Sequence, residues 1–404
     1  MTKIPEGMLA RIIGHRAIPA LLIAFFGYFI LWASLFWAGV MPGAEGSIVD
    51  FHAFHIAGQM AWGGKIVSAY DPEAMHAAQV ALTGSEDFLH WAYPPPFDIV
   101  VAALALMPLG LSFFFFTALT FGGFLWVLHR LAGEWIGLVL LAIAPAVFVD
   151  IFAGQNGFLT AFLLGLAVMI TLKGGALAGV PLGLMVIKPH LAVGLGVVLL
   201  ARRHWAILAL AAGVAVASGL VATAFLGTGV WPAFLHGAEQ SGHYLERAEF
   251  PLFRMTSVYA TLRTLGAGPD LAFLAQALVA LSAVGGIGYA GWRLRDPRLA
   301  MGVAILGSIL ISPYNYDYDL TLLGLGLAIL APHLAVRIGP VDAAGLLVLS
   351  WLATGSGLAT LLLIEASDPV PGIPSGLATR SFAAFACLAL VIWTGLVLRR
   401  PARG

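Results

Sequence analysis

The chain has 404 residues, of which 60% are hydrophobic and 10% charged, and its mean hydropathy is +0.96. A soluble domain carries about 25% charged residues and must cover its surface with polar groups, so this composition excludes a water-soluble globular protein. The formal net charge of zero gives no basic field for nucleic acid. The single cysteine, Cys387, excludes an intramolecular disulfide framework.

Hydrophobic segments recur along the chain and predict an all-α polytopic membrane protein. A helix needs about 20 apolar residues to cross the bilayer, and some of the candidate segments must tilt or thin it. The first segment is too long for a signal peptide and no small-residue cleavage site follows it, so we expect it to remain as a membrane helix. The candidates are 17–40, 112–131, 134–151, 157–172, 205–227, 270–292, 299–312, 319–336, 341–363 and 380–398.

Three further apolar segments, 97–108, 175–187 and 190–201, are too short to cross at about 1.5 Å per residue. Such half-helices are tolerated where their ends line a cavity. The chain is therefore expected to form one membrane domain over 1–404, with about 10–13 transmembrane or half-membrane helices.

Basic residues between the segments predict the orientation, because they favour the cytoplasmic side. The resulting arrangement places loops 42–96, 228–269 and 364–379 outside and makes 175–201 a hairpin dipping from the inner side, with Lys188 at its tip. The polar motifs then collect at the outer face. The basic residues assigned to the inside are Lys3, Arg11, Arg16, His129, Arg130, Lys173, Arg202, Arg203, Arg293, Arg295, Arg298, Arg337, Arg399 and Arg400.

The first outer loop contains a short amphipathic helix predicted at about 51–63. Asp50 precedes this helix and Asp71 precedes a second one, so each carboxylate could cap the first turn that follows it. His52 and His55 lie three residues apart and could share a helix face. A pair of histidines without a third ligand is only a weak indication of a zinc site.

Polar residues also interrupt the later apolar segments. Asp98 follows three prolines and enters a half-helix, where an ionisable group is costly unless it faces a cavity. Gln155 and Asn156 begin a membrane helix and could either cap it or bind hydroxyl groups. Lys188 lies within a 27-residue hydrophobic stretch. A buried lysine needs an anion, and here a ligand phosphate and a structural carboxylate such as Asp150 are equal alternatives.

Asp317 and Asp319 form a D-x-D pattern where two hydrophobic segments meet. Hard cations favour carboxylate oxygens, so the pair could hold a divalent cation with a diphosphate ligand. Helix capping by one carboxylate and solvent exposure of the other is the simpler interpretation. No other cofactor or metal is predicted.

Read together, these motifs resemble glycosyltransferase family 87, the polyprenyl-phosphate-mannose-dependent mannosyltransferase-like proteins of the GT-C superfamily. The resemblance covers roughly 17–335, and its motifs occur in the expected order. They are Val49-Asp50-Phe51, Gly64, Tyr70-Asp71, Tyr93-Pro94-Pro95, Met107-Pro108-Leu109, Gly154-Gln155-Asn156, Lys188-Pro189, Arg202-Arg203-His204-Trp205 and Ser312-Pro313.

The resemblance implies a GT-C-like multi-helix bundle in the plasma or inner membrane, with its active site on the extracytoplasmic side. The donor would be a polyprenyl phosphate sugar, the acceptor a hydroxyl of a glycan or glycolipid, and Asp50 the general base of an inverting transfer. Mannosyltransferases of this family tend to show histidine after the Ser-Pro motif, where this chain has Tyr316, Asp317 and Asp319. The family therefore implies mannose as the donor sugar, but this part of the sequence does not match the mannosyltransferase pattern.

Substrate contacts are expected from residues of all these motifs, with Lys188 or Arg254 holding the charge of the lipid phosphate. The expected binding residues are His55, Gln59, Tyr70, Tyr93, Gln155, Asn156, Lys188, His190, Arg254, Tyr316, Asp317 and Asp319.

A transporter or flippase of a lipid-linked or polar substrate is the main alternative, because half-helices meeting beside a buried lysine are typical of secondary transporters. That function predicts inverted repeats and polar residues at both faces. The sequence shows no such repeat and groups its polar motifs at the outer face. A non-catalytic protein of the same fold is a third interpretation.

Overall fold

The computed structural model describes residues 17–364, 377 and 379–402. Lys3, Arg11 and Arg16 and nearly all of the predicted loop 364–379 lie outside this part of the chain. The described residues are mainly helical and form no strand, which confirms the predicted all-α class. Six helical segments are long and apolar enough to cross a membrane.

These six segments correspond to predicted spans. They are α2 (Ala17–Trp37), α7 (Leu109–Ala132) with its continuation into α8 (Ile136–Ala142), α13 (Trp205–Leu226), α16 (Pro269–Arg293), η5 (Asp317–Leu320) with α18 (Thr321–Ala335), and α19 (Pro340–Ile364). Shorter helices complete the bundle: α9 (Ala144–Ala153), α10 (Gly157–Leu172), α11 (Gly179–Leu184), α12 (Pro189–Ala201), α17 (Pro297–Ser308) and α20 (Ala383–Leu398).

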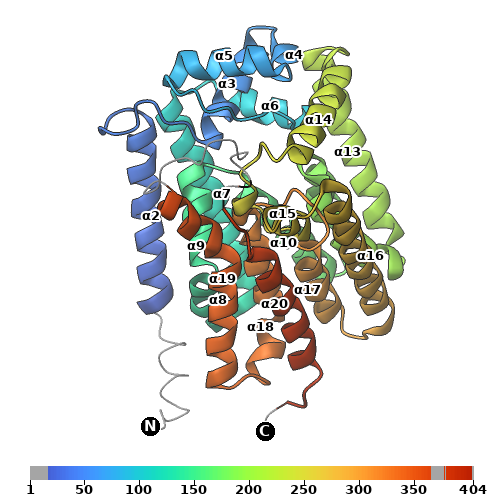
Figure 1. Cartoon of the computed structure of the whole chain (residues 1–404). Coiled ribbons are helices and arrows are strands. Elements are labelled where there is room, and N and C mark those ends of the chain that lie inside the picture. The colour runs from blue at the N-terminus through green and yellow to red at the C-terminus, as the bar shows by residue number, and fades with distance from the viewer. Residues whose placement is uncertain (1–16, 365–376, 378, 403–404) are drawn as a thin grey trace.

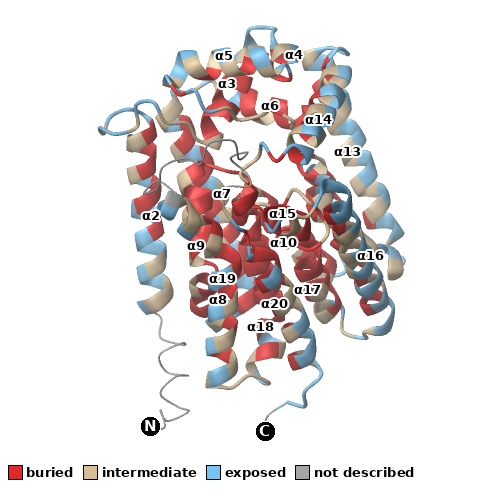
Figure 2. Ribbon diagram, viewed as in Figure 1, coloured by how far each residue is buried: buried red, intermediate tan, exposed pale blue. Residues whose placement is uncertain are grey.

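The span that ends in α18 forms the centre of the bundle. In the most apolar 18-residue stretch of this span, 83% is buried. The corresponding share is 11% for α13 and 17% for α16, and the apolar side chains of these two helices face outward (Figure 2). Glycine allows α17 to approach α18 closely, since a Cβ added at Gly302 would lie 2.5 Å from Leu330. Small residues at helix contacts are typical of membrane bundles, where lipid gives no hydrophobic drive for helix association.

The single helix predicted at 134–151 is wrong, because the structure divides it into α8 and α9 at Ile143. Pro145 has no N–H to donate to the carbonyl of Leu141, and its ring disfavours a continuous helix. Trp351 of α19 donates its indole N–H to that carbonyl at 2.7 Å. A neighbouring helix therefore supplies the hydrogen bond that the proline removes.

An upper layer covers one end of the bundle in Figure 1. It consists of α3 (Asp50–Trp62), α4 (Ile66–Ala69), α5 (Pro72–Thr83), α6 (Pro95–Leu104) and α14 (Val230–Glu246). The predicted cap of α5 is confirmed, since Asp71 Oδ1 accepts from the N–H of Ala74 at 2.9 Å. The capping interpretation of Asp50 is wrong. Asp50 is the first residue inside α3, and the Val49 N–H donates to His52 Nδ1 at 3.1 Å.

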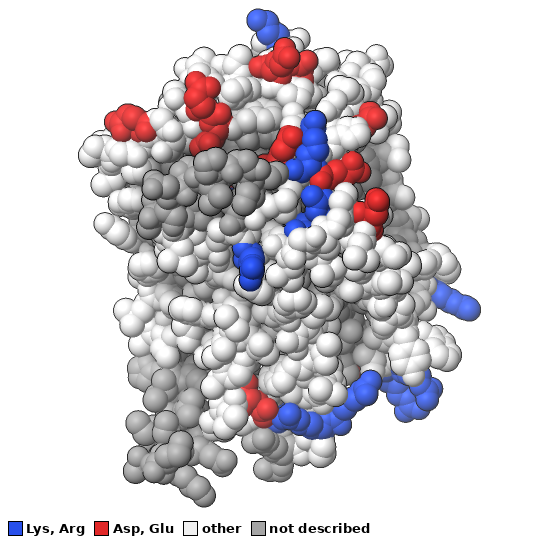
Figure 3. All heavy atoms as spheres, viewed as in Figure 1, with Lys and Arg blue, Asp and Glu red and all other residues white. Residues whose placement is uncertain are grey.

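Charged side chains divide between the two ends of the molecule. On the face shown in Figure 3, Asp and Glu lie mainly near the upper layer, whereas Lys and Arg occur in both halves and also form a row along the opposite end. At the lower end Arg337 Nε donates to the Arg400 carbonyl at 3.0 Å, and Arg400 pairs with Asp342 at 2.9 Å. The orientation of the two ends relative to the membrane stays a prediction.

Candidate active site

A cavity of about 430 Å³ lies between the upper layer and the bundle. Segments distant in sequence line it: the start of α3, the loop before α6, the start of α10, the junction of α11 and α12, and the segments around 250 and 316. It brings together eight of the predicted site residues, namely Asp50, Tyr93, Gln155, Lys188, His190, Arg254, Tyr316 and Asp319.

Asp50 is half-buried in the cavity wall at the N-terminus of α3. Burial raises the pKa of its carboxyl above the ordinary value of 3.8, and the charge of Arg254, the side chain of Gln155 and the charge of Lys188 oppose this shift. A carboxylate whose pKa is raised binds a proton more strongly and is a better general base near neutral pH. The direction of the shift comes from removal of water around the carboxylate.

Gln155 has a fixed orientation beside Asp50. Its Oε1 accepts from the Tyr93 hydroxyl at 3.1 Å and from the Asn156 N–H at 2.8 Å, which leaves the amide nitrogen to interact with Asp50. The preceding Gly154 has a φ of +63°, and a Cβ there would lie 2.6 Å from the Phe113 ring. Only glycine fits this left-handed, crowded turn.

Lys188 lies between two short helices, as predicted, and its anionic partner is Asp319, with Nζ 2.8 Å from Oδ1. Lys188 Nζ also lies 4.9 Å from the centre of the Tyr318 ring. Asp150, the alternative partner, instead accepts the N–H groups of Gly157 at 3.2 Å and Phe158 at 2.8 Å. It therefore caps α10, where a carboxylate satisfies amides of the first turn.

Arg254 makes a two-pronged ion pair with Asp317, through Nε to Oδ2 at 3.1 Å and Nη2 to Oδ1 at 3.0 Å. Asp317 and Asp319 are only 1% and 3% exposed, so the interpretation of one as a solvent-exposed carboxylate is wrong. Each holds a different cation. No three His, Cys, Asp or Glu side chains gather as a metal site anywhere in the described residues.

Four predicted binding residues, besides the ion-paired Asp317, do not line the cavity. On α3, the Nε2 atoms of His55 and Gln59 lie 3.2 Å apart and interact with each other. Asn156 is fully buried at the start of α10. Tyr70 is 2% exposed, and its ring is covered by neighbouring elements.

The hydroxyl of Tyr70 has a structural role under the cavity wall. It lies 2.8 Å from both the Tyr93 carbonyl and Asp98 Oδ2, while Trp91 Nε1 donates to Asp98 Oδ1 at 3.1 Å. The tyrosine hydroxyl has one hydrogen, and it shares this hydrogen between the Tyr93 carbonyl and the Asp98 carboxyl group. This network holds the loop that carries Tyr93.

Several cavity residues were not predicted from the sequence. Among them are six aromatic or histidine side chains: Phe88, His90, Phe234, Phe250, Tyr314 and Tyr318. The close run of tyrosines from 314 to 318 was the available signal, since aromatic side chains often line ligand sites.

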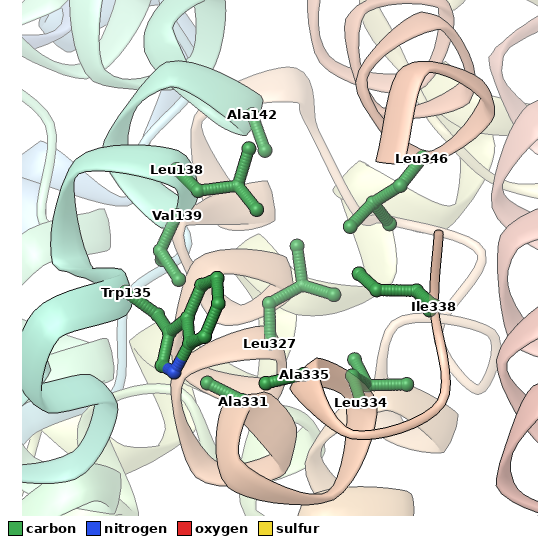
Figure 4. A pocket seen from close by; sticks show the side chains of 10 residues that line it. All are labelled: Trp135, Leu138, Val139, Ala142, Leu327, Ala331, Leu334, Ala335, Ile338 and Leu346. Atoms are coloured by element: carbon green, nitrogen blue, oxygen red, sulfur yellow. The ribbon is translucent and has the colours of Figure 1, made fainter. Parts of the chain in front are cut away.

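A second cavity has a different character. It measures about 30 Å³ and is shown in Figure 4. No charged side chain lines it, and Trp135 carries its nitrogen among otherwise aliphatic neighbours such as Leu138 and Leu346. It is too small and too apolar for a sugar, so the larger cavity is the candidate active site.

Comparison with models of protein families finds glycosyltransferase family 87 over residues 91–313. The matched segment contains Gln155, Lys188 and Arg254, while Asp50 precedes it and Asp319 follows it. Comparisons with curated proteins and with solved structures gave no match. The family match extends over more than half of the chain, and this integral membrane protein therefore belongs to glycosyltransferase family 87.

Proposed function

We propose that the protein transfers a sugar from a polyprenyl phosphate to an acceptor hydroxyl on the extracytoplasmic side, with inversion at the anomeric carbon. The observation that carries this proposal is that the Asp50 carboxylate lines the same cavity as two ion-paired cations, Lys188 and Arg254. A base and an anion site are the two groups that such a transfer requires.

Asp50 is the proposed base. The acceptor oxygen attacks the anomeric carbon and its proton passes to the Asp50 carboxylate, while the bond from that carbon to the phosphate oxygen breaks. The polyprenyl phosphate leaves with the electron pair. Because the phosphate is a good leaving group, the step needs no acid, and a positioned base contributes about 10²–10⁴-fold.

Lys188 and Arg254 are the proposed phosphate ligands. Lysine has three N–H donors and arginine five, whereas Asp319 uses one donor of Lys188 and Asp317 uses two of Arg254. The ion pairs fix both cations and leave donors that can serve a phosphate from the cavity. Oriented donors in a site that excludes bulk water stabilise the developing charge of a leaving group.

The test uses purified protein in nanodiscs and labelled polyprenyl phosphate mannose and glucose. We expect Asp50→Asn to lower kcat by about 10²–10⁴-fold without a comparable change in donor KM. The matched control is Asp87→Asn, an exposed carboxylate of the same loop, which should retain activity. Full activity in a folded Asp50→Asn variant would refute the base, and use of a nucleotide sugar alone would refute the donor class.

A further inference from the structure

Aromatic rings form a continuous arc along one wall of the cavity. His90 lies 5.9 Å from Phe88 and 5.1 Å from Tyr244, measured between ring centres. Tyr244 lies 6.1 Å from Phe250, which lies 6.0 Å from Tyr314. All five side chains are half-buried, and all but Tyr244 line the cavity. We call these five residues the aromatic arc.

His90 brings an unused hydrogen-bond acceptor into this arc. Its Nε2 lies 2.9 Å from the Gly237 carbonyl, and because a carbonyl can only accept, Nε2 carries the hydrogen. Burial lowers the pKa of the imidazole, so the ring is neutral and Nδ1 has a lone pair. Nδ1 is buried, and it has no partner within the described part of the chain.

A buried acceptor without a partner is destabilising, and a hydrogen-bond donor on a ligand can satisfy it. The phosphate oxygens of the donor accept hydrogen bonds and cannot offer one to Nδ1. A prenyl chain offers no polar hydrogen either. A sugar ring has both complements, hydroxyl donors for His90 and an apolar C–H face for the aromatic rings, and pockets that combine aromatic walls with few polar groups suit such ligands.

We propose that the aromatic arc and His90 Nδ1 form the acceptor subsite and that the acceptor presents a pyranose ring there. The donor's own sugar offers the same hydroxyls and C–H face, and the comparison of acceptor KM with donor KM below distinguishes the two sources. The inference rests on the proposed function, which assigns Lys188 and Arg254 to the donor phosphate. Glu249 also lines the cavity, and its carboxylate is paired with Arg247 at 3.0 Å, so it adds no unpaired charge to the wall. His90 acts as a specificity-determining residue and not as a base.

Two amide substitutions separate the nitrogens of His90. His90→Gln places its amide near the Nε2 position, so it keeps a donor for Gly237 and removes the Nδ1 acceptor. His90→Asn does the reverse. With methyl α-D-mannopyranoside as the acceptor, we expect His90→Gln to raise the acceptor KM about tenfold, while donor KM and donor hydrolysis by water stay within about twofold. His90→Asn should keep the acceptor KM closer to wild type.

The arc has its own paired test. Phe88→Leu removes a ring from the cavity wall and should raise the same acceptor KM, whereas Phe115→Leu, at an outward-facing site that is 43% exposed, should not. Glycerol, which offers hydroxyls without a ring, should be a much poorer acceptor. An unchanged acceptor KM in His90→Gln, an equal rise in donor KM, or equal use of glycerol would overturn the proposal.

A binding measurement separates this proposal from the proposed function. Methyl α-D-mannopyranoside can be titrated against the tryptophan fluorescence of the intact protein, since Trp91 adjoins His90 in the chain. Weaker binding in His90→Gln than in His90→Asn supports the subsite even if no polyprenyl phosphate sugar proves to be a donor. Equal binding by both variants and wild type refutes the subsite. Transfer from the lipid donor is tested separately, by the transfer assay described above.

Discussion

Removing the charge of Lys188 should destabilise the protein by leaving the carboxylate of Asp319 alone in the interior. The two side chains are only 9% and 3% exposed, and Lys188 Nζ lies 2.8 Å from Asp319 Oδ1. Breaking a buried ion pair at one partner costs about 3–5 kcal/mol, chiefly because the remaining charge has no compensation. Lys188→Met also loses the contact of the ammonium with the Tyr318 ring, at 4.9 Å, which adds about 0.5–2 kcal/mol.

The double variant Lys188→Met, Asp319→Asn should recover most of this loss. Asparagine keeps an oxygen for the Tyr316 N–H, which donates to Asp319 Oδ2 at 3.2 Å, and no charge remains unpaired. Replacing a buried ion pair by neutral groups is often close to neutral in free energy. We therefore expect the double variant to lie within about 1–2 kcal/mol of wild type, far below the sum of two single variants that cost about 3–5 kcal/mol each.

Equilibrium unfolding in mixed detergent micelles, applied to all four proteins of the cycle, measures this coupling. Single variants that each cost less than about 1 kcal/mol and add independently would refute the argument that the pair is buried and mutually dependent.

The double variant also allows the effect of Lys188 on donor binding to be measured in a protein that folds normally. If Lys188 binds the lipid phosphate, this folded protein should have a strongly raised donor KM, and unchanged donor binding would exclude that role. Lys173→Met, at an exposed lysine, is the control.

Three further predictions concern Asp50 and the start of α10. Because burial raises the Asp50 pKa above 3.8, the acid limb of the kcat/KM profile should lie above that pH, and a limb at or below it would contradict the assignment. A raised carboxyl pKa also means that ionised Asp50 destabilises the fold above its pKa, so Asp50→Asn should be thermally more stable than wild type at pH 7. Gly157→Ala should unfold at lower temperature than wild type, because its Cβ would lie 2.5 Å from the Tyr318 carbonyl, whereas Gly122→Ala, with open space around it, should melt like wild type.

Hydrophobic length and proline chemistry made much of the fold predictable. Apolar runs identified the long spans, and Asp71 before Pro72 identified the capped α5, because these signals act within one turn or one membrane thickness. The break at Ile143 was missed. Pro145 marked it in the sequence, but Trp351, which makes the break tolerable by bonding the freed Leu141 carbonyl, is distant along the chain.

The sequence by itself determined that the protein lies in a membrane and that Asp50, Gln155 and Lys188 were worth attention as polar groups in apolar surroundings. Only the tertiary structure decided their partners. Lys188 pairs with Asp319 and not with Asp150, and Tyr70 supports the wall instead of facing the cavity. A polar residue inside an apolar segment can be recognised from the sequence alone, because its burial depends on the residues next to it in the chain. Ion pairing and cavity lining depend on which helices pack together, a property that no local spacing records.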